Sequence, residues 1–211
     1  MPSLDIYSDF NSDLLSTLLR KRHNVQITNQ NCYGTTYPEK RIESGNESCL
    51  IWFSVASFSK TYDIKEGAID KAIQAYIDWV NSTSKQYKRL YICSMENASI
   101  PKGLGINKPV RLSHAYLCSL LNGELIKMSL INSKVTFIDT NAWRQMCNKI
   151  SDPKNWYLTK NPYSIEFTKY AAENIMQIIK LSVTGRETKI IFLDLDNTIW
   201  GGEIGECGIE Q

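Results

Sequence analysis

The stretch "CLIWFSVASFSKTYDIKEGAIDKAIQAYIDWV", Cys49 to Val80, contains the two patterns that decide the fold. It opens with an apolar run, 49–55, rich in β-branched and aromatic side chains, which is typical of a strand buried on both faces. After Asp63, apolar residues recur at three- and four-residue steps from Ile64 to Val80, with charged residues outside the stripe. This stretch therefore predicts a buried strand followed by an amphipathic helix that lies on a sheet.

Similar patterns recur along the whole chain. Further buried strands are predicted at 4–8, 89–95, 134–140 and 189–194. Further helical stripes run through 112–121 and 167–179, the second ending near Gly185. Strands that alternate with helices of this length favour right-handed βαβ units. The sequence therefore predicts an α/β protein with a doubly wound, mainly parallel sheet in three layers.

Composition limits the classes of function. With 211 residues, 43% of them hydrophobic, one domain plus a fragment fits better than two full domains. The 24 basic and 22 acidic side chains are interspersed without a basic run, so no nucleic-acid partner is expected. No 18-residue apolar segment and no signal-peptide pattern occur, which predicts neither a membrane span nor export. Six scattered cysteines without metal-site spacing favour a reduced, cytoplasmic protein.

The most chemically suggestive motif is "FLDLDNT", 192–198, at the end of a predicted strand. Asp194 and Asp196 are two residues apart, so in an extended strand both carboxylates point to one side. Such a pair suits a hard cation such as Mg²⁺, and it can divide the work of a nucleophile and a general acid. Asp and Asn also favour ordinary turns. The apolar run before the pair, Thr198 after it and the glycines beyond favour chemistry.

The same motif resembles a known family. "DLDNTIWGG" is similar to the first motif, D-x-D-x-T, of the haloacid dehalogenase (HAD) superfamily, and "KIIFLDLDNTIWGGEIGECG" resembles its FkbH-like branch (HAD-IIIC type). The segment 151–175 also resembles the region that precedes the motif in that branch. The resemblance is strong over the last third of the chain and architectural elsewhere.

The resemblance implies specific roles. Asp194 would be the nucleophile that forms an aspartyl-phosphate, Asp196 the general acid-base, and both would contribute to an Mg²⁺ site. FkbH-like proteins are associated with loading a glyceryl unit from a phosphorylated three-carbon substrate onto an acyl carrier protein thiol, in polyketide and surface-polysaccharide pathways. The partners implied are therefore a carrier protein and a small phosphorylated or acyl substrate.

A complete HAD site also requires residues on later strands. Only 13 residues follow Thr198, too few for one βαβ crossover. We therefore expect this 211-residue chain to be inactive in phosphoryl transfer by itself, with Mg²⁺ bound only in a complete HAD domain. The expected organisation is an amino-terminal α/β domain (1–183), a linker (184–188), and the first strand and flap of a Rossmann-like HAD domain (189–211).

In FkbH-like proteins the region before the motif resembles the SGNH hydrolase fold, which is flavodoxin-like. The resemblance aligns Ser8 and Asp9 with the glycine and aspartate of its G-D-S block, and places Phe10 where the nucleophilic serine belongs. Near the end, Asp152 fits the acid of the D-x-x-H block, but Trp156 and Tyr157 stand where the histidine is expected. The domain is therefore expected to keep the fold without the hydrolytic chemistry.

The chain's two histidines also give little support to a serine hydrolase. His23 reads as a polar helix end and His114 as the start of a helix, and neither is predicted beside Ser8. A binding role remains, with Ser8, Asp9 and Asn11 in a turn and the loop 97–109 shaping a cleft at the carboxyl edge. Three basic residues near that loop would offer a modest counterpart to an acidic carrier: Lys102, Lys108 and Arg111.

Three hypotheses follow. The first is the amino-terminal portion of an FkbH-like enzyme. The second is a non-catalytic binding module for a carrier protein or an acyl or sugar ligand. The third and weakest is an SGNH-type esterase or acyltransferase that uses Ser8.

Overall fold

The computed structural model describes residues 2–38, 44–62, 64, 67–96 and 113–184. Its centre is a sheet of five strands, all paired in parallel, in the order β2-β1-β3-β4-β5. The strands are β1 (Ser3–Ser8), β2 (Gln26–Asn31), β3 (Ser48–Trp52), β4 (Arg89–Cys93) and β5 (Val135–Ile138). The predicted α/β class with a parallel sheet is confirmed.

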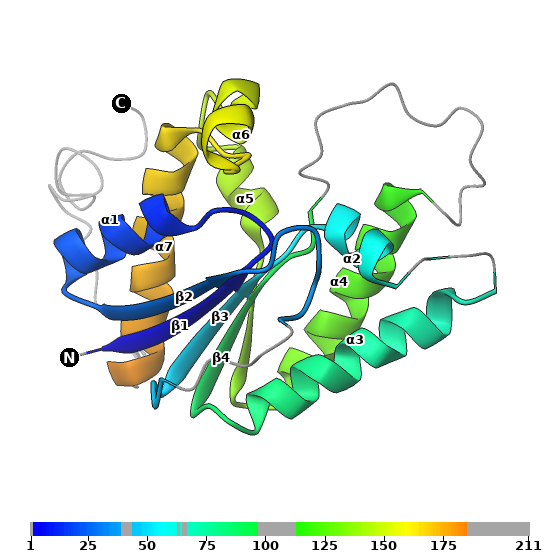
Figure 1. Cartoon of the computed structure of the whole chain (residues 1–211). Helices are drawn as coiled ribbons and strands as arrows, with labels where there is room; N and C mark the ends of the chain where they lie inside the picture. Colours follow the sequence, from blue (N-terminus) through cyan, green and yellow to red (C-terminus); the bar gives the residue numbers. More distant parts are fainter. Residues whose placement is uncertain (1, 39–43, 63, 65–66, 97–112, 185–211) are drawn as a thin grey trace, which may run out of the picture. The chain divides into compact units, whose positions relative to one another are not determined.

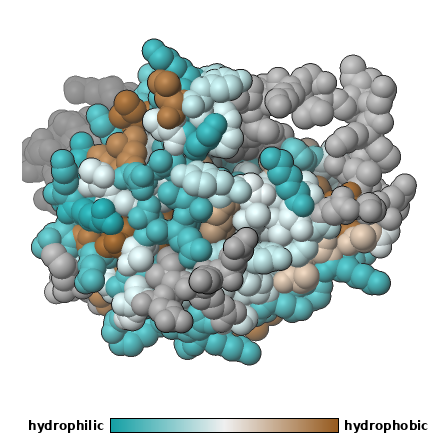
Figure 2. Space-filling view, in the orientation of Figure 1, coloured by the Kyte–Doolittle hydropathy of each residue, from teal (hydrophilic) through white to brown (hydrophobic). Residues whose placement is uncertain are grey.

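Helices cover both faces of the sheet. They are α1 (Asp13–His23), α2 (Val55–Thr61), α3 (Ile69–Ser84), α4 (His114–Ile131), α5 (Thr140–Arg144), α6 (Pro153–Thr159) and α7 (Ile165–Thr184). Figure 1 shows α1 and the amino-terminal part of α7 on one face, and α3 and α4 on the other. On the side of the molecule that Figure 2 shows, polar side chains predominate and strongly apolar ones gather in small patches.

Alternation along each strand explains the three layers. Tyr7 and Ile51 point into the core beneath α2, α3 and α4, whereas their neighbours Ile6 and Leu50 are buried outside that cluster. Because both faces are covered, the central strands are mostly apolar, with Asp5 of β1 as a buried exception, which is why the sequence shows them as nearly continuous apolar runs.

The predicted elements differ from the observed ones mainly at their ends. The run 49–55 is a strand only to Trp52, because the Ser54 side chain accepts a hydrogen bond from the Ser57 amide and begins α2. The helix expected from Ile64 begins at Ile69. The strand β2 was not predicted, since Ile27 is the only apolar residue in "QITNQN".

Two compact units divide the chain, Met1–Met176 and Gln177–Gln211. The sheet belongs to the first unit. The predicted linker, the strand at 189–194 and the helix end at Gly185 concern residues outside the described ones, so that domain division stays a prediction. Among the described helices, none is long and apolar enough to cross a membrane.

Candidate functional site

The strand order places a reversal of direction beside β1. The chain moves from β1 outward to β2 and then returns to the other side of β1 to form β3. In open parallel sheets, ligands bind at the carboxyl ends of the strands where this reversal occurs. The residues that follow β1, β3 and β4 are therefore the first place to look for a site. We call the polar residues there, Asp9, Ser54, Ser57 and Glu96, the carboxyl-edge cluster.

Asp9 lies at the centre of this cluster. Its Oδ2 accepts hydrogen bonds from the Ser54 amide (3.0 Å), the Ser54 hydroxyl and the Ser57 hydroxyl (2.6 Å). The side chain thus joins the end of β1 to the start of α2. Burial raises the pKa of the Asp9 carboxyl above its ordinary value of 3.8, and the hydrogen bonds from Ser54 and Ser57 oppose that rise.

Ser8 is completely buried at the end of β1. Its Oγ lies 2.8 Å from the carbonyl oxygen of Phe10 and 3.2 Å from Oδ1 of Asn31, which also accepts a hydrogen bond from the Ser12 hydroxyl (2.9 Å). The Oδ1 atom of Asn11 accepts a hydrogen bond from the Asp13 backbone amide (2.8 Å), and the backbone amide of Asn11 donates to the Lys160 carbonyl (3.0 Å). The predicted cleft residues Ser8, Asp9 and Asn11 thus lie together, but each holds local structure.

Glu96, which the sequence analysis did not single out, follows β4. Its carboxylate accepts hydrogen bonds from Thr140 and from Nη2 of Arg144 (2.8 Å), and only 1% of its side chain is exposed. Its backbone carbonyl accepts a hydrogen bond from the Val55 amide (3.0 Å). Val55 directly follows Ser54, which donates hydrogen bonds to Asp9. Burial raises the pKa of Glu96 above 4.5, and the charge and hydrogen bond of Arg144 oppose that rise.

An aromatic cluster fills the space around these groups. Phe10, at the position expected for a nucleophilic serine, packs edge-on against Trp52 (ring centroids 5.3 Å apart) and Tyr163 (5.2 Å). Trp52 also contacts Trp143 and Phe167. Phe10 is 4% exposed and Trp52 2%. A bulky ring therefore occupies the position that the sequence resemblance aligns with the nucleophilic serine.

The residues expected to supply a hydrolytic acid and base have other roles. Asp152 caps α6 by accepting a hydrogen bond from the Lys154 amide (3.0 Å), and it pairs with Lys149 (2.7 Å). His23, at the end of α1, has its Nε2 3.1 Å from Glu173 of α7. His114 is the first residue of α4. The hydroxyl of Ser8 is hydrogen-bonded to Phe10 and Asn31, so this geometry gives no support to a triad based on Ser8.

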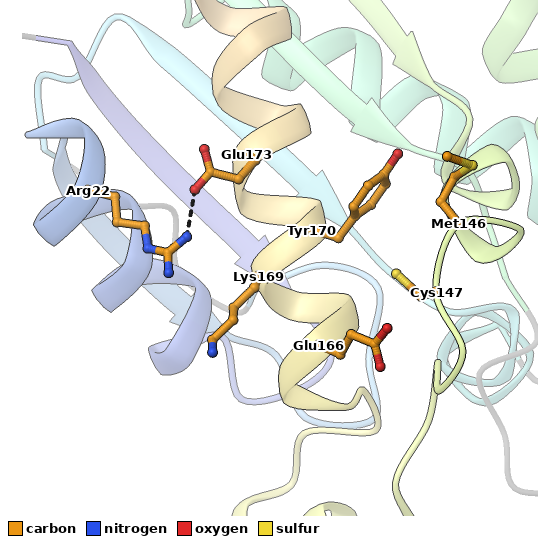
Figure 3. A pocket seen from close by; sticks show the side chains of 7 residues that line it. All are labelled: Arg22, Met146, Cys147, Glu166, Lys169, Tyr170 and Glu173. Carbon is orange, nitrogen blue, oxygen red and sulfur yellow. Dashed lines mark hydrogen bonds and ion pairs between the residues drawn. The ribbon is translucent and has the colours of Figure 1, made fainter.

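One hollow of about 410 Å³ lies between α1, α7 and the segment after α5. Figure 3 shows Arg22 and Glu173 pointing toward each other across it, with the charged groups of Lys169 and Glu166 nearby. The Arg22–Glu173 ion pair measures 2.8 Å and both side chains are nearly half exposed. This hollow is open, its acids and bases are balanced, and its lining residues do not belong to the carboxyl-edge cluster.

Several predicted residues lie outside the described ones. These are Asp194 and Asp196, the loop 97–109, and Lys102, Lys108 and Arg111. Among the described residues, no group of three or more His, Cys, Asp or Glu side chains could hold a metal ion.

Four further residues of this region were not predicted from the sequence: Ser54, Ser57, Thr140 and Arg144. A usable signal existed for Ser54, because Ser-x-x-Ser after an apolar run is compatible with a helix cap. Arg144 and Thr140 pair with a residue more than 40 positions away, which no local pattern reveals.

Comparison with known proteins gives a likeness of fold. No protein-family model and no curated protein matches the chain by sequence. Among solved structures, the N-terminal part of protein BF1531 from Bacteroides fragilis, which contains a phosphatase domain and is complexed with Mg, is similar over 98% of this chain, with a TM-score of 0.71 and 19% identity. The chain spans 59% of the length of that structure.

Two further structures share the fold of the sheet. A protein from Bacteroides fragilis assigned as an acylhydrolase is similar over 86% of this chain and 88% of its own, with a TM-score of 0.56 and 14% identity. The catalytic domain of the peptidoglycan O-acetyltransferase OatA from Streptococcus pneumoniae is similar over 87% of this chain and 94% of its own, with a TM-score of 0.50 and 10% identity. The chain therefore has the α/β fold of acylhydrolase-like proteins, in agreement with the predicted SGNH-like architecture.

Proposed function

We propose that this chain is the amino-terminal portion of an FkbH-like HAD enzyme, with an SGNH-like domain that binds or positions rather than hydrolyses. The observation that carries the proposal is the likeness over 98% of the chain to the N-terminal part of BF1531, which contains a phosphatase domain. That likeness extends beyond the sheet to nearly the whole chain, whereas the acylhydrolase and acetyltransferase match 86% and 87% of it. The D-x-D-x-T motif at 194–198 supports the same assignment.

The carboxyl edge supports a non-hydrolytic role for the SGNH-like domain. A serine hydrolase needs an accessible hydroxyl with a base within hydrogen-bonding distance. Here Phe10 occupies the nucleophile position, Ser8 is fully buried, and Asp9 is held by Ser54 and Ser57. Because these groups already satisfy one another, the part of this edge that the structure describes has the properties of a packed core rather than of an open acyl-binding site.

In the proposed reaction, a carboxylate oxygen of Asp194 attacks the phosphorus of a phosphorylated three-carbon substrate. The bond from phosphorus to the leaving oxygen breaks, and Asp196 gives that oxygen a proton. Water then cleaves the aspartyl-phosphate and releases inorganic phosphate. The complete enzyme would go on to place a glyceryl-type acyl unit on the thiol of an acyl carrier protein, in cytoplasmic polyketide or surface-polysaccharide biosynthesis. For this step the substrate would carry a second phosphate as an acyl phosphate. The thiol would attack its carbonyl carbon, the bond from that carbon to the phosphate oxygen would break, and inorganic phosphate would leave as the thioester forms.

The donor set suits magnesium. Asp194 and Asp196 offer hard carboxylate oxygens of the kind that Mg²⁺ takes together with substrate phosphate oxygens. A bound Mg²⁺ would neutralise charge on the transferred phosphoryl group. The neighbouring BF1531 structure is complexed with Mg, which supports testing this ion first.

The experiment uses the protein encoded by the complete reading frame. It is incubated with Mg²⁺, phosphorylated glycerates and a carrier protein, quenched in acid, digested and analysed by mass spectrometry. We expect one phosphoryl group on the peptide that contains Asp194 and an acyl group on the carrier thiol. Asp194→Asn should abolish both, and Asp70→Asn, an exposed residue on α3, should change neither.

Phosphorylation of a different peptide, or carrier loading that survives Asp194→Asn, would overturn the assignment of the nucleophile. Asp194 phosphorylation without carrier loading would keep the phosphatase and reject the transfer step.

A further inference from the structure

The outer face of α4 differs from that of an ordinary surface helix. An amphipathic helix on a sheet normally exposes polar and charged residues. The helix α3 does so, with Asp70, Lys71, Gln74 and Asp78 exposed. On α4, by contrast, the large side chains Ile126, Leu130 and Ile131 are 43%, 81% and 87% exposed.

The opposite side of α4 packs against the hydrophobic core on the sheet. The buried residues Leu117, Leu121, Leu125 and Met128 belong to the core beneath the helix. They recur at steps of three and four residues and so form one stripe. The exposed positions Ala115, Ser119, Ile126 and Leu130 form a second stripe on the other side of the helix, and this stripe carries no charge.

Charge does not oppose self-association of this stripe. Between His114 and Ile131 the charged residues are Glu124 and Lys127. They form an ion pair with each other at 2.7 Å along the helix. The surface of α4 therefore carries no unbalanced charge in this stretch that two copies would have to bring together.

The sizes of the exposed residues are graded along the helix. Ala115 and Ser119 in the amino-terminal half are small, whereas Ile126 and Leu130 in the carboxyl-terminal half are large. Near the midpoint, a methyl group added at Gly123 would meet nothing within 4 Å. Glycine inside a helix lowers its stability relative to alanine and removes bulk from the surface, so a second helix can approach closely there.

We propose that this stripe is the interface of a symmetric dimer in which α4 packs antiparallel against α4 of a second copy. A twofold axis through the midpoint of the helix, between Asn122 and Gly123, brings Ala115 opposite Leu130 and Ser119 opposite Ile126. Each small residue then faces a large one, which is the arrangement that lets two packed surfaces interdigitate. A parallel pair would instead place small residues against small ones and large against large.

The test measures self-association of the 211-residue chain. Sedimentation of samples from about 1 to about 300 µM should show a monomer–dimer equilibrium, because a contact made by one helix from each copy is small. Leu130→Lys should raise the dissociation constant at least about 10-fold, since it replaces an exposed apolar side chain of the contact by a charge that would face Ala115 of the second copy. The matched control is Leu158→Lys on α6, where the leucine is 71% exposed and away from α4.

Cysteine cross-linking tests the orientation. Under mild oxidation, Gly123→Cys should form a disulfide with its counterpart more efficiently than the parent protein forms dimers through its own cysteines. Ala115→Cys should not do so, because in the antiparallel pair its two copies are about 22 Å apart along the axis. A mixture of Ala115→Cys and Leu130→Cys proteins should give the mixed dimer.

Sedimentation as a monomer throughout would overturn the proposal, and so would a dimer that Leu158→Lys disrupts and Leu130→Lys does not. Self-cross-linking of Ala115→Cys as strong as that of Gly123→Cys would overturn the antiparallel arrangement. Association of α4 only with a different protein or domain would reject the second copy as its occupant.

Discussion

The two ends of β1 each carry a buried aspartate, and their comparison shows how far a polar network is evidence of catalysis. Asp5, near the amino end, accepts hydrogen bonds from Ser44 Oγ (2.6 Å), Asn46 Nδ2 (2.6 Å) and Tyr87 OH (2.8 Å). Asp9, past the carboxyl end, accepts from Ser54 and Ser57 in a similar way. The amino end of a parallel sheet is not where ligands bind. Because Asp5 has an equally complete set of donors, such a set at Asp9 is by itself a structural feature.

The two networks differ in what they hold. The donors to Asp5 come from positions 39, 41 and 82 residues away, so this carboxyl group joins three segments of the chain. Asp9 joins the end of β1 to one turn of α2. We therefore expect substitutions at Asp5 to destabilise the fold more than substitutions at Asp9.

The largest effect is expected for Asp5→Ala. Removing the carboxyl group leaves the buried donors of Ser44, Asn46 and Tyr87 without their acceptor, which should lower the free energy of unfolding by about 3–5 kcal/mol. Urea denaturation measures the loss. Asp70→Ala, at an exposed position on α3, is the control and should change the free energy by less than about 0.5 kcal/mol. A loss at Asp5 as small as that of the control would reject its structural role.

A smaller, pH-dependent effect is expected for Asp9→Asn. Burial raises the folded pKa of Asp9 above 3.8, so the folded state holds this proton more tightly than the unfolded state. The stabilisation is fully present below pH 3.8 and is lost as the pH rises through the folded pKa. The free energy of unfolding of the wild type, relative to Asp9→Asn, should therefore fall as the pH rises above about 4.

Denaturation at a series of pH values measures this difference. Glu96 has a raised pKa in both proteins, so its contribution largely cancels from the comparison. A difference that grows with pH would show that the ionised form of Asp9 is the stabilised one, which would contradict the assigned effect of burial.

The smallest effect is expected for Ser8→Ala. The hydroxyl of Ser8 lies 2.8 Å from the Phe10 carbonyl, and its loss should cost about 1 kcal/mol. Neither the wild type nor the variant should hydrolyse a short-chain p-nitrophenyl ester above background. Wild-type turnover that disappears with this substitution would restore the esterase hypothesis.

The sequence allowed most of the architecture to be predicted because the central strands are buried on both faces. β1, β3 and β4 appear as apolar runs for that reason, and α3 appears as a stripe because one side of it faces the core. β2 lies at the edge of the sheet and buries only Ile27 in "QITNQN", so its sequence resembles a loop. The short helix α2 was hidden because its first residue, Val55, continues the apolar run of β3.

The candidate site was less accessible to prediction. Ser8, Asp9 and Asn11 could be placed at the carboxyl edge because Ser8 ends a predicted strand and the other two closely follow it. The partners that give this edge its character, Glu96 and Arg144, are 48 residues apart and their pairing depends on the packed fold. The sequence also could not show whether Phe10 lines a cleft or fills one, because this depends on the rings of Trp52 and Tyr163 from distant segments of the chain.

The most direct measurement of the central claim is steady-state phosphate release by the protein encoded by the complete reading frame, supplied with Mg²⁺ and a phosphorylated three-carbon acid. The claim is that phosphoryl transfer takes place at Asp194 and that the carboxyl edge of the SGNH-like domain has a structural role. It predicts that Asp194→Asn lowers the rate at least about 1,000-fold and that Ser8→Ala leaves the rate within about two-fold of the wild type. Phosphate release that persists in Asp194→Asn, or that is lost in a folded Ser8→Ala protein, would contradict the claim.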